Sequence, residues 1–387
     1  MSDAENALEL VKTSAEAAQV VTELLDSAAK LSSALGALGP LFGVAAAIVK
    51  LVLGNVDSPE MAYMKEQFAA VRNQLDKISD KITEVILEIK NSTMKNQYFT
   101  VEENIKNQFR KYMDILNAEP EYREKEKEEF LSHFNASKGD QNLHTLYEGV
   151  MGSTSIFAES VLDTAMNHSQ RDRRLMEELC AGLKELFCIG LIALMGHAEL
   201  TGNNVTALGQ EWNEKMLNIE RKMKSLVDRC IAEFADQAGE DVSKFLKDKS
   251  GKENREFSSY VLEELKKKYD WISWSVRVYN DVGGFDNHCV CGTNRFHFFR
   301  NNGCNIVVSY SRDPQPIDQN HIKQLMDGKN DWDDAREVAT FIYDHLSGSY
   351  VVHTVRRLKG LWGAWNFPEA AHFWENYSGV TLCVHRA

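Results

Sequence analysis

The chain has 387 residues, which is enough for two or three domains that each bury a core. Its composition, 43% apolar and 26% charged, is that of an ordinary globular protein. A formal net charge of −13 argues against nucleic acid as a main partner, because phosphate binding needs a basic face.

The amino terminus and the cysteines indicate a compartment. The chain begins MSDAENALEL, which carries acidic residues where a signal peptide carries basic ones. Seven scattered cysteines fit reduced thiols better than a disulfide framework. We therefore expect a protein that is cytoplasmic as synthesised, and we leave open membrane association and non-classical release.

Residues 34–53 form the first unusual segment, because Lys50 is the single charge among them. A helix of this length would reach roughly 30 Å, the thickness of the hydrocarbon core of a bilayer. Gly39, Gly43 and Ala47 recur every four residues and would line a groove of small side chains for helix–helix contact.

Two interpretations of segment 34–53 are compatible with each other. In the resting protein we expect it to be hidden inside a soluble helical bundle, because its flanks are acidic. On a trigger it would leave the bundle and insert into a membrane, as in soluble helical pore-forming proteins. The residues predicted to insert are Leu35, Leu38, Gly39, Leu41, Phe42, Gly43, Val44, Ala47, Ile48, Val49, Leu51, Val52 and Leu53.

A very long helix is expected to begin at Pro59, which follows a serine cap. Apolar residues recur three and four apart from Met61 to Ile89, a coiled-coil-like stripe, and the stripe resumes after a phase slip near Asn91. A single helix over 60–117 would be about 85 Å long. Such a helix predicts an elongated bundle that could form a homo-oligomer, although a hairpin bend near Asn91 stays open.

Further helices are expected at 121–134, 154–168, 171–199, 206–247 and 256–268. Within the third of these, Leu186–Ala198 is apolar on all sides but only thirteen residues long. We interpret it as a buried core helix rather than a membrane span.

The pattern changes near Asp270, after which the chain holds six of its seven tryptophans. From Trp271 the periodicity is two, with Ser275, Arg277 and Tyr279 on one face of a strand and Trp274, Val276 and Val278 on the other. Other strands are expected in NRFHFF, NIVVSYS, YVVHTV and TLCVHR, and helices around 318–327, 333–346 and 369–375.

These patterns predict a mainly α fold class. Residues 1–268 would form an elongated helical bundle with very long helices, and residues 269–387 a smaller α+β domain rich in aromatic residues.

A basic and aromatic run lies in the second domain, where Arg356, Arg357 and Lys359 precede Trp362 and Trp365. Basic residues followed by tryptophan suit contact with lipid head groups or an anionic ligand, because tryptophan favours the boundary between polar and apolar media. The alternative is a strand end with a solvated arginine pair and tryptophans buried in a small core.

No motif for catalysis is present: the chain lacks G-x-S-x-G, H-E-x-x-H, a phosphate-binding glycine loop and C-x-x-C. His288, Cys289, Cys291 and Cys304 lie close in sequence, but C-x-C is not the spacing of a zinc knuckle. We therefore predict no catalytic residue, no cofactor and no metal site.

Several stretches carry a resemblance: SPEMAYMKEQF at 58–68, LFCIGLIALMGH at 186–197, KYDWISWSVRVYND at 268–281, NIVVSYS at 305–311 and HFWENY at 372–377. In these the chain resembles the rapunzel family of vertebrate, chiefly fish, proteins. The helical first half also resembles the amino-terminal region of cephalotoxin-like proteins. The resemblance implies a link to growth of fin and skeleton and to immune signalling, without an established biochemical activity, and it transfers no catalytic residue.

The sequence therefore favours a non-enzymatic protein that interacts with lipid membranes, with segment 34–53 as the inserting part and the second domain recognising the surface. The alternative is an intracellular scaffold that binds protein partners and keeps the apolar segment as a core helix. Nucleic acid is excluded as a partner in both cases.

Overall fold

The computed structural model describes residues 83, 86, 92–152, 160–249, 251–329 and 331–387. The chain divides into two compact units, Met1–Ala232 and Glu233–Ala387. Segment 34–53 and residues 60–82 of the expected long helix lie outside the described residues, as do all the residues predicted to insert. The two units are described one at a time.

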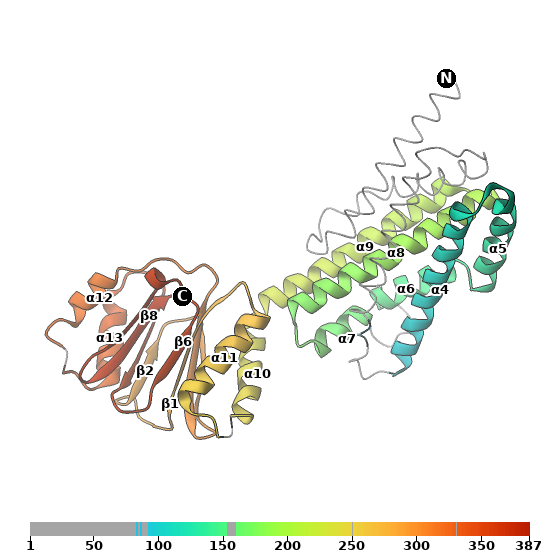
Figure 1. Cartoon of the computed structure of the whole chain (residues 1–387). Coiled ribbons are helices and arrows are strands. Elements are labelled where there is room, and N and C mark those ends of the chain that lie inside the picture. Colours follow the sequence, from blue (N-terminus) through green and yellow to red (C-terminus); the bar gives the residue numbers. More distant parts are fainter. Residues whose placement is uncertain (1–82, 84–85, 87–91, 153–159, 250, 330) are drawn as a thin grey trace. The chain divides into compact units, whose positions relative to one another are not determined.

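The described part of the first unit is helical, as predicted (Figure 1). Its elements are α4 (Ser92–Asn117), the 3-10 turn η2 (Pro120–Tyr122), α5 (Arg123–Ala136), α6 (Gln141–Met151), α7 (Val161–His168), α8 (Arg173–Thr201) and α9 (Val205–Ala232). The predicted stripe is confirmed in α4, where Tyr98, Ile105, Tyr112 and Leu116 are buried. The coiled-coil stripe from Met61 to Ile89 and the continuity of the helix from residue 60 stay predictions.

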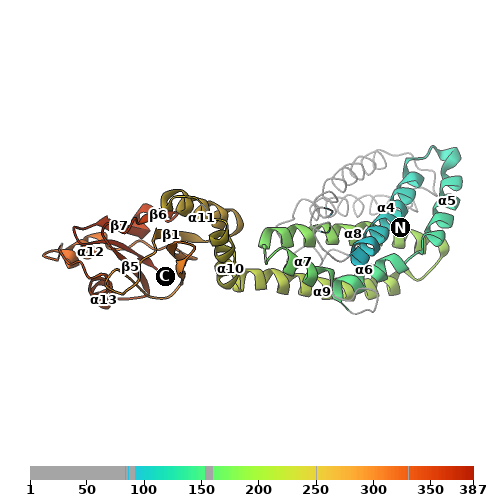
Figure 2. The same cartoon turned by 90° about the horizontal axis from the view of Figure 1, so that it is seen from below.

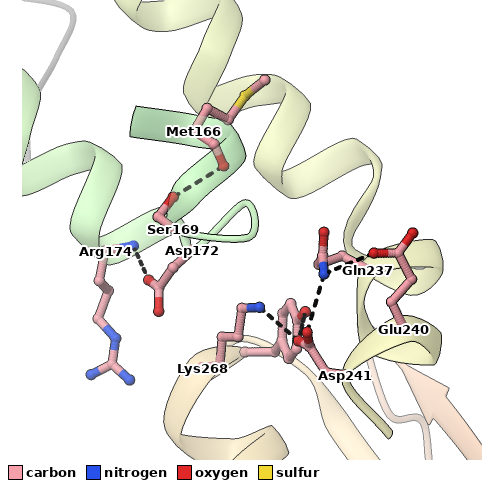
Figure 3. Close-up of polar contacts among 9 residues, drawn as sticks. Met166, Ser169, Asp172, Arg174, Gln237, Glu240, Asp241 and Lys268 are labelled. Carbon is pink, nitrogen blue, oxygen red and sulfur yellow. Dashed lines mark hydrogen bonds and ion pairs between the residues drawn. The ribbon is translucent and has the colours of Figure 1, made fainter. Parts of the chain in front are cut away.

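Helix α8 lies at the centre of the helical core. Asp172 caps its amino terminus by accepting hydrogen bonds from the backbone N–H groups of Arg174 (3.0 Å) and Leu175 (3.2 Å), the first of which Figure 3 shows. Within the described part of the chain, α8 is the one helix long and apolar enough to span a membrane, and 94% of its most apolar window is buried in the protein. The prediction that Leu186–Ala198 is a core helix is confirmed.

Two glycines allow neighbouring helices to approach α8 closely. A Cβ atom on Gly196 would lie 2.3 Å from the ring of Tyr112 in α4, and one on Gly190 would lie 2.5 Å from Leu143 in α6. Both distances are shorter than any normal contact, so these two positions require glycine for the observed packing.

The second unit is a sandwich of two antiparallel sheets with helices on both outer faces. Figure 2 shows α11 and α13 on opposite sides of the strands, with α11 next to β1 and α13 next to β5. One sheet has the order β3-β4-β1-β6, formed by Arg295–Asn301, Cys304–Ser311, Ser273–Asn280 and Trp362–Trp365. The other has the order β2-β5-β8-β7, formed by His288–Cys291, Tyr350–Arg356, Val380–Arg386 and His372–Asn376. The helices are α10 (Phe234–Lys247), α11 (Asn254–Lys268), α12 (Gln319–Met326) and α13 (Ala335–His345).

Side chains alternate along β1 as predicted, so one face of the strand packs against helices and the other against the second sheet. Trp274, Val276 and Val278 belong to the core that α10 and α11 cover. Ser275 and Arg277 point the other way and bond to residues of the second sheet. Both faces are buried, so this unit has a helix–sheet core and a separate sheet–sheet interior.

Two expectations for helices are corrected, and three short elements were not predicted. The helix expected at 206–247 is two helices, α9 and α10, which lie in different units. The helix expected at 369–375 is a short 3-10 turn, Glu369–Ala371, followed by strand β7. The short strands β2 and β6 and helix α6 were not predicted. For the two strands the reason is length, because four residues are too few for a clear period.

The boundary between the units differs from the expected one at residues 268 and 269. Helices α10 and α11 bury Phe234, Val242 and Val261 against β1, β3 and β4, so they belong with the sheets. Asp241 joins the two helices, because it accepts hydrogen bonds from Lys268 Nζ at 2.6 Å and Gln237 Nε2 at 3.1 Å (Figure 3). Tyr269 also donates its hydroxyl hydrogen to Asp241, at 2.7 Å.

Candidate functional site

The predicted basic and aromatic residues lie at one open edge of the sandwich. Strands β6 and β7 are the last strands of their sheets, so neither pairs with a further described strand on its outer side. A groove of about 490 Å³ lies beside them. Its lining comprises the loop 356–361 and the residues Trp362, Gly363, Trp365, Trp374, Asn376 and Thr381.

The loop before β6 is held at its base and open at its tip. Asn254 of α11 donates a hydrogen bond from Nδ2 to the Gly360 carbonyl at 2.9 Å, and the Asn280 N–H donates to the Lys359 carbonyl at 2.9 Å. Gly360 has φ +64° and lies against Asn280, so a larger residue would strain the turn. Leu358 at the tip is 96% exposed.

Trp365 forms a stacked platform with Trp374, and Trp362 lines the same groove. Trp362 is 47% exposed and Trp365 is 38% exposed, which is unusual for the largest apolar side chain. The Trp365 ring stacks on the Trp374 ring of β7, with centroids 5.2 Å apart, and on the His372 ring at 4.5 Å. Gly363 permits this arrangement, because a Cβ atom there would lie 2.6 Å from Trp374. The alternative in which both Trp362 and Trp365 are buried in a small core is therefore wrong.

The three basic residues differ in what they contact. Arg356 forms an ion pair with Asp333. Arg357 and Lys359 have no side-chain hydrogen bond or ion pair to any residue that the structure describes, and Arg357 is exposed. Two cationic groups are thus free to bind an anion beside the tryptophans, and a third is already neutralised.

The structure therefore brings all five predicted recognition residues to one groove and adds two that the sequence did not suggest. Trp374 stacks in the platform, and Arg255 of α11 places its guanidinium over the Trp362 ring, 5.1 Å from the centroid. The stretch HFWENY contains Trp374 and alternates as an edge strand does, but we expected a helix at 369–375.

Comparison with known proteins supports the helical character of the first half and the resemblance to the rapunzel family. The family model described as "Cephalotoxin-like middle helical domain" matches residues 55–253. Protein rapunzel of zebrafish (Danio rerio) is 42% identical over 210 residues, which are 54% of this chain and 92% of that protein. The chain belongs to the rapunzel family. No solved structure matches it.

This member of the rapunzel family also has a polar interior between its two sheets. Arg277 is fully buried, and its guanidinium donates to Ser309 Oγ at 2.8 Å, Ser275 Oγ at 3.1 Å and Cys383 Sγ at 3.4 Å. His372 shares a hydrogen bond with Ser275 Oγ at 2.9 Å, and His385 with Ser309 Oγ at 2.6 Å. We call these six residues the polar seam.

Electrostatics keep the histidines of the polar seam neutral. Burial, reinforced by the Arg277 cation, lowers the pKa of His372 and that of His385 to about 3. His353 is also fully buried near Arg277, and the same two causes hold its pKa well below the usual value. The guanidinium of Arg277 donates to two hydroxyls and a thiol, so none of these hydrogen-bond acceptors neutralises its positive charge.

His288, Cys289, Cys291 and Cys304, the residues considered as zinc ligands, do not converge on one point. His288 faces the sheet–sheet interior and bonds through Nδ1 to the Tyr279 hydroxyl at 3.0 Å, whereas Cys304 is buried in the core under α10 and α11. Among the described residues, no group of three or more His, Cys, Asp or Glu is arranged to hold a metal ion.

Proposed function

We propose that this protein binds lipid membranes and catalyses no reaction. The groove at the β6–β7 edge recognises anionic head groups, and segment 34–53 inserts into the bilayer on a trigger. The observation that carries the proposal is the pair of exposed tryptophans, Trp362 and Trp365, beside the unpaired cations of Arg357 and Lys359. Tryptophan is enriched at the membrane interface, and a basic residue near an anionic leaflet contributes about 1 kcal/mol.

The charge of the whole chain makes this local patch necessary. With a net charge of −13 the protein is repelled by an anionic surface, and only a local excess of cations reverses that repulsion. The groove offers Arg357 and Lys359, while Asp333 lies outside it as the partner of Arg356.

The insertion step is assigned to segment 34–53 for two reasons. Helix α8, the other apolar segment, is a core helix whose removal would expose most of the helical core. Segment 34–53 is longer without interruption by charge, and Gly39, Gly43 and Ala47 would allow close helix–helix contact in the bilayer.

The recognition step is tested by sedimentation with liposomes, neutral or containing anionic lipid. Arg357→Gln/Lys359→Gln should weaken binding to the anionic liposomes roughly thirtyfold, because two contributions of about 1 kcal/mol are lost. Lys247→Gln/Lys267→Gln is the matched control, since both lysines are exposed on helices of the same unit and form no side-chain hydrogen bond or ion pair with described residues. Trp362→Ala/Trp365→Ala should weaken binding to both kinds of liposome.

The insertion step is tested separately by dye release. Gly43→Glu should abolish release and leave liposome binding unchanged, because the proposal assigns recognition to Arg357, Lys359 and the tryptophans. Equal binding by wild type and by Arg357→Gln/Lys359→Gln would refute the recognition step. Absence of liposome binding under any condition would refute the proposal as a whole and favour the scaffold with protein partners.

A further inference from the structure

Two thiols lie side by side on the outer face of the second sheet. Cys289 and Cys291 are two residues apart on β2, so their side chains point to the same side of the strand. Both pack against the core under α12 and α13, and both remain partly exposed.

Charged groups of both signs surround this pair: Arg336 and Arg295 favour a thiolate, and Asp334 and Asp344 oppose one. Arg336 in the first turn of α13 and Arg295 of β3 both act electrostatically on Cys289. The amino terminus of α13 is held close by, because Thr354, the cross-strand neighbour of Cys289, donates a hydrogen bond to the Ala335 carbonyl at 2.5 Å. Helix amino termini and arginines stabilise thiolates.

We propose that Cys289 and Cys291 form a two-coordinate binding site for a single soft metal ion, copper(I). Soft thiolate ligands select copper(I). The complex of one such ion with two thiolates carries a net charge of −1, and Arg336 and Arg295 attract this anion. Zinc would need four ligands, and no larger metal-ligating group is found in the described part of the chain.

Strand geometry favours a bridging ion over a direct disulfide. Residues two apart in a strand have Cα atoms roughly 6.6–6.8 Å apart, the upper limit of the range for disulfides. The register of β2 with β5 is regular from His288 to Cys291, so the strand could shorten only by breaking its ladder. Two metal–sulfur bonds of about 2.3 Å instead bridge sulfur atoms up to roughly 4.6 Å apart.

The test is an anaerobic titration of the full-length chain with copper(I) against a chromophoric chelator. The wild type should retain one ion per chain, with an X-ray absorption spectrum that has two sulfur neighbours. Cys289→Ser and Cys291→Ser should each weaken binding more than roughly 100-fold, because loss of an outer partner alone costs about 10–100-fold. Cys230→Ala, in the helical unit, is the matched control, and circular dichroism checks that each variant is folded.

Three results would overturn the proposal. They are equal copper affinity in the Cys289→Ser/Cys291→Ser double variant, three or more sulfur neighbours in the spectrum, and a disulfide between Cys289 and Cys291 in the native protein mapped by mass spectrometry. None of them bears on the membrane proposal, because the dithiol and the groove share no residue.

Discussion

Acidification should destabilise the sandwich unit. Protons bind more tightly to its histidines in the unfolded chain than to the same histidines in the folded polar seam. His372 and His385 have pKa values of about 3 in the folded protein and 6.5 when unfolded. A histidine with a lowered folded pKa contributes stability that is complete above pH 6.5 and is lost as the pH falls below it. The window of loss therefore runs from about pH 6.5 down to about pH 3.

The magnitude follows from the size of the shift. Between about pH 7.5 and pH 5, each of His372 and His385 lowers the free energy of unfolding by ~2 kcal/mol, because one pKa unit corresponds to about 1.4 kcal/mol. The two together remove ~4 kcal/mol, and His353 adds a loss of the same sign. Domains are stable by only about 5–15 kcal/mol, so a loss of ~4 kcal/mol removes a large fraction of the stability of the unit by pH 5.

The assay is urea unfolding followed by tryptophan fluorescence at the two pH values, since six of the seven tryptophans lie after residue 270. In His372→Gln/His385→Gln the difference between the two pH values should shrink by ~4 kcal/mol. His321→Gln is the control, because His321 is exposed on α12. Equal stability of the wild type at both pH values, or an unchanged pH dependence in the double variant, would refute the reasoning.

Three further predictions concern single residues. Gly363→Ala should destabilise the sandwich unit by about 1–3 kcal/mol and weaken liposome binding, since its Cβ atom would lie 2.6 Å from Trp374; a folded variant with unchanged binding contradicts this. Asp241→Asn should cost about 3 kcal/mol in urea unfolding, because it leaves Lys268 without its 2.6 Å partner, and a cost under about 1 kcal/mol would show that the pair is dispensable. Burial raises the pKa of Glu185 to about 8, so between pH 5 and pH 7 rising pH should destabilise the helical unit by about 2–3 kcal/mol; circular dichroism should find this dependence gone in Glu185→Gln.

The long elements were predictable because each spans several periods of its apolar pattern. Helix α8 combines an aspartate cap at Asp172 with a run of apolar residues, and both signals are local. Strand β1 alternates over eight residues, and the structure confirms which side chains share a face. The clustering of Arg357, Lys359, Trp362 and Trp365 followed from their closeness in sequence.

The errors fall where a short segment takes its structure from distant neighbours. Strand β7 forms because β8 offers a free edge for pairing from His372 to Asn376, although its composition is compatible with a helix. Helices α10 and α11 belong to the sandwich because Phe234 and Val261 fit against its strands, which no feature of their own sequence indicates.

The sequence by itself determined the helical character of the first half, the strand character of most of the second, and the presence of a basic and aromatic run. These are local properties, set by backbone propensity and by the period of apolar residues. The tertiary structure alone decided that Trp374 joins Trp365, that Arg356 is neutralised by Asp333, and that Arg277 lies beside Cys383, 106 residues away. Such contacts depend on how two sheets stack, because side chains on facing strands meet only when the separate strands have paired and packed.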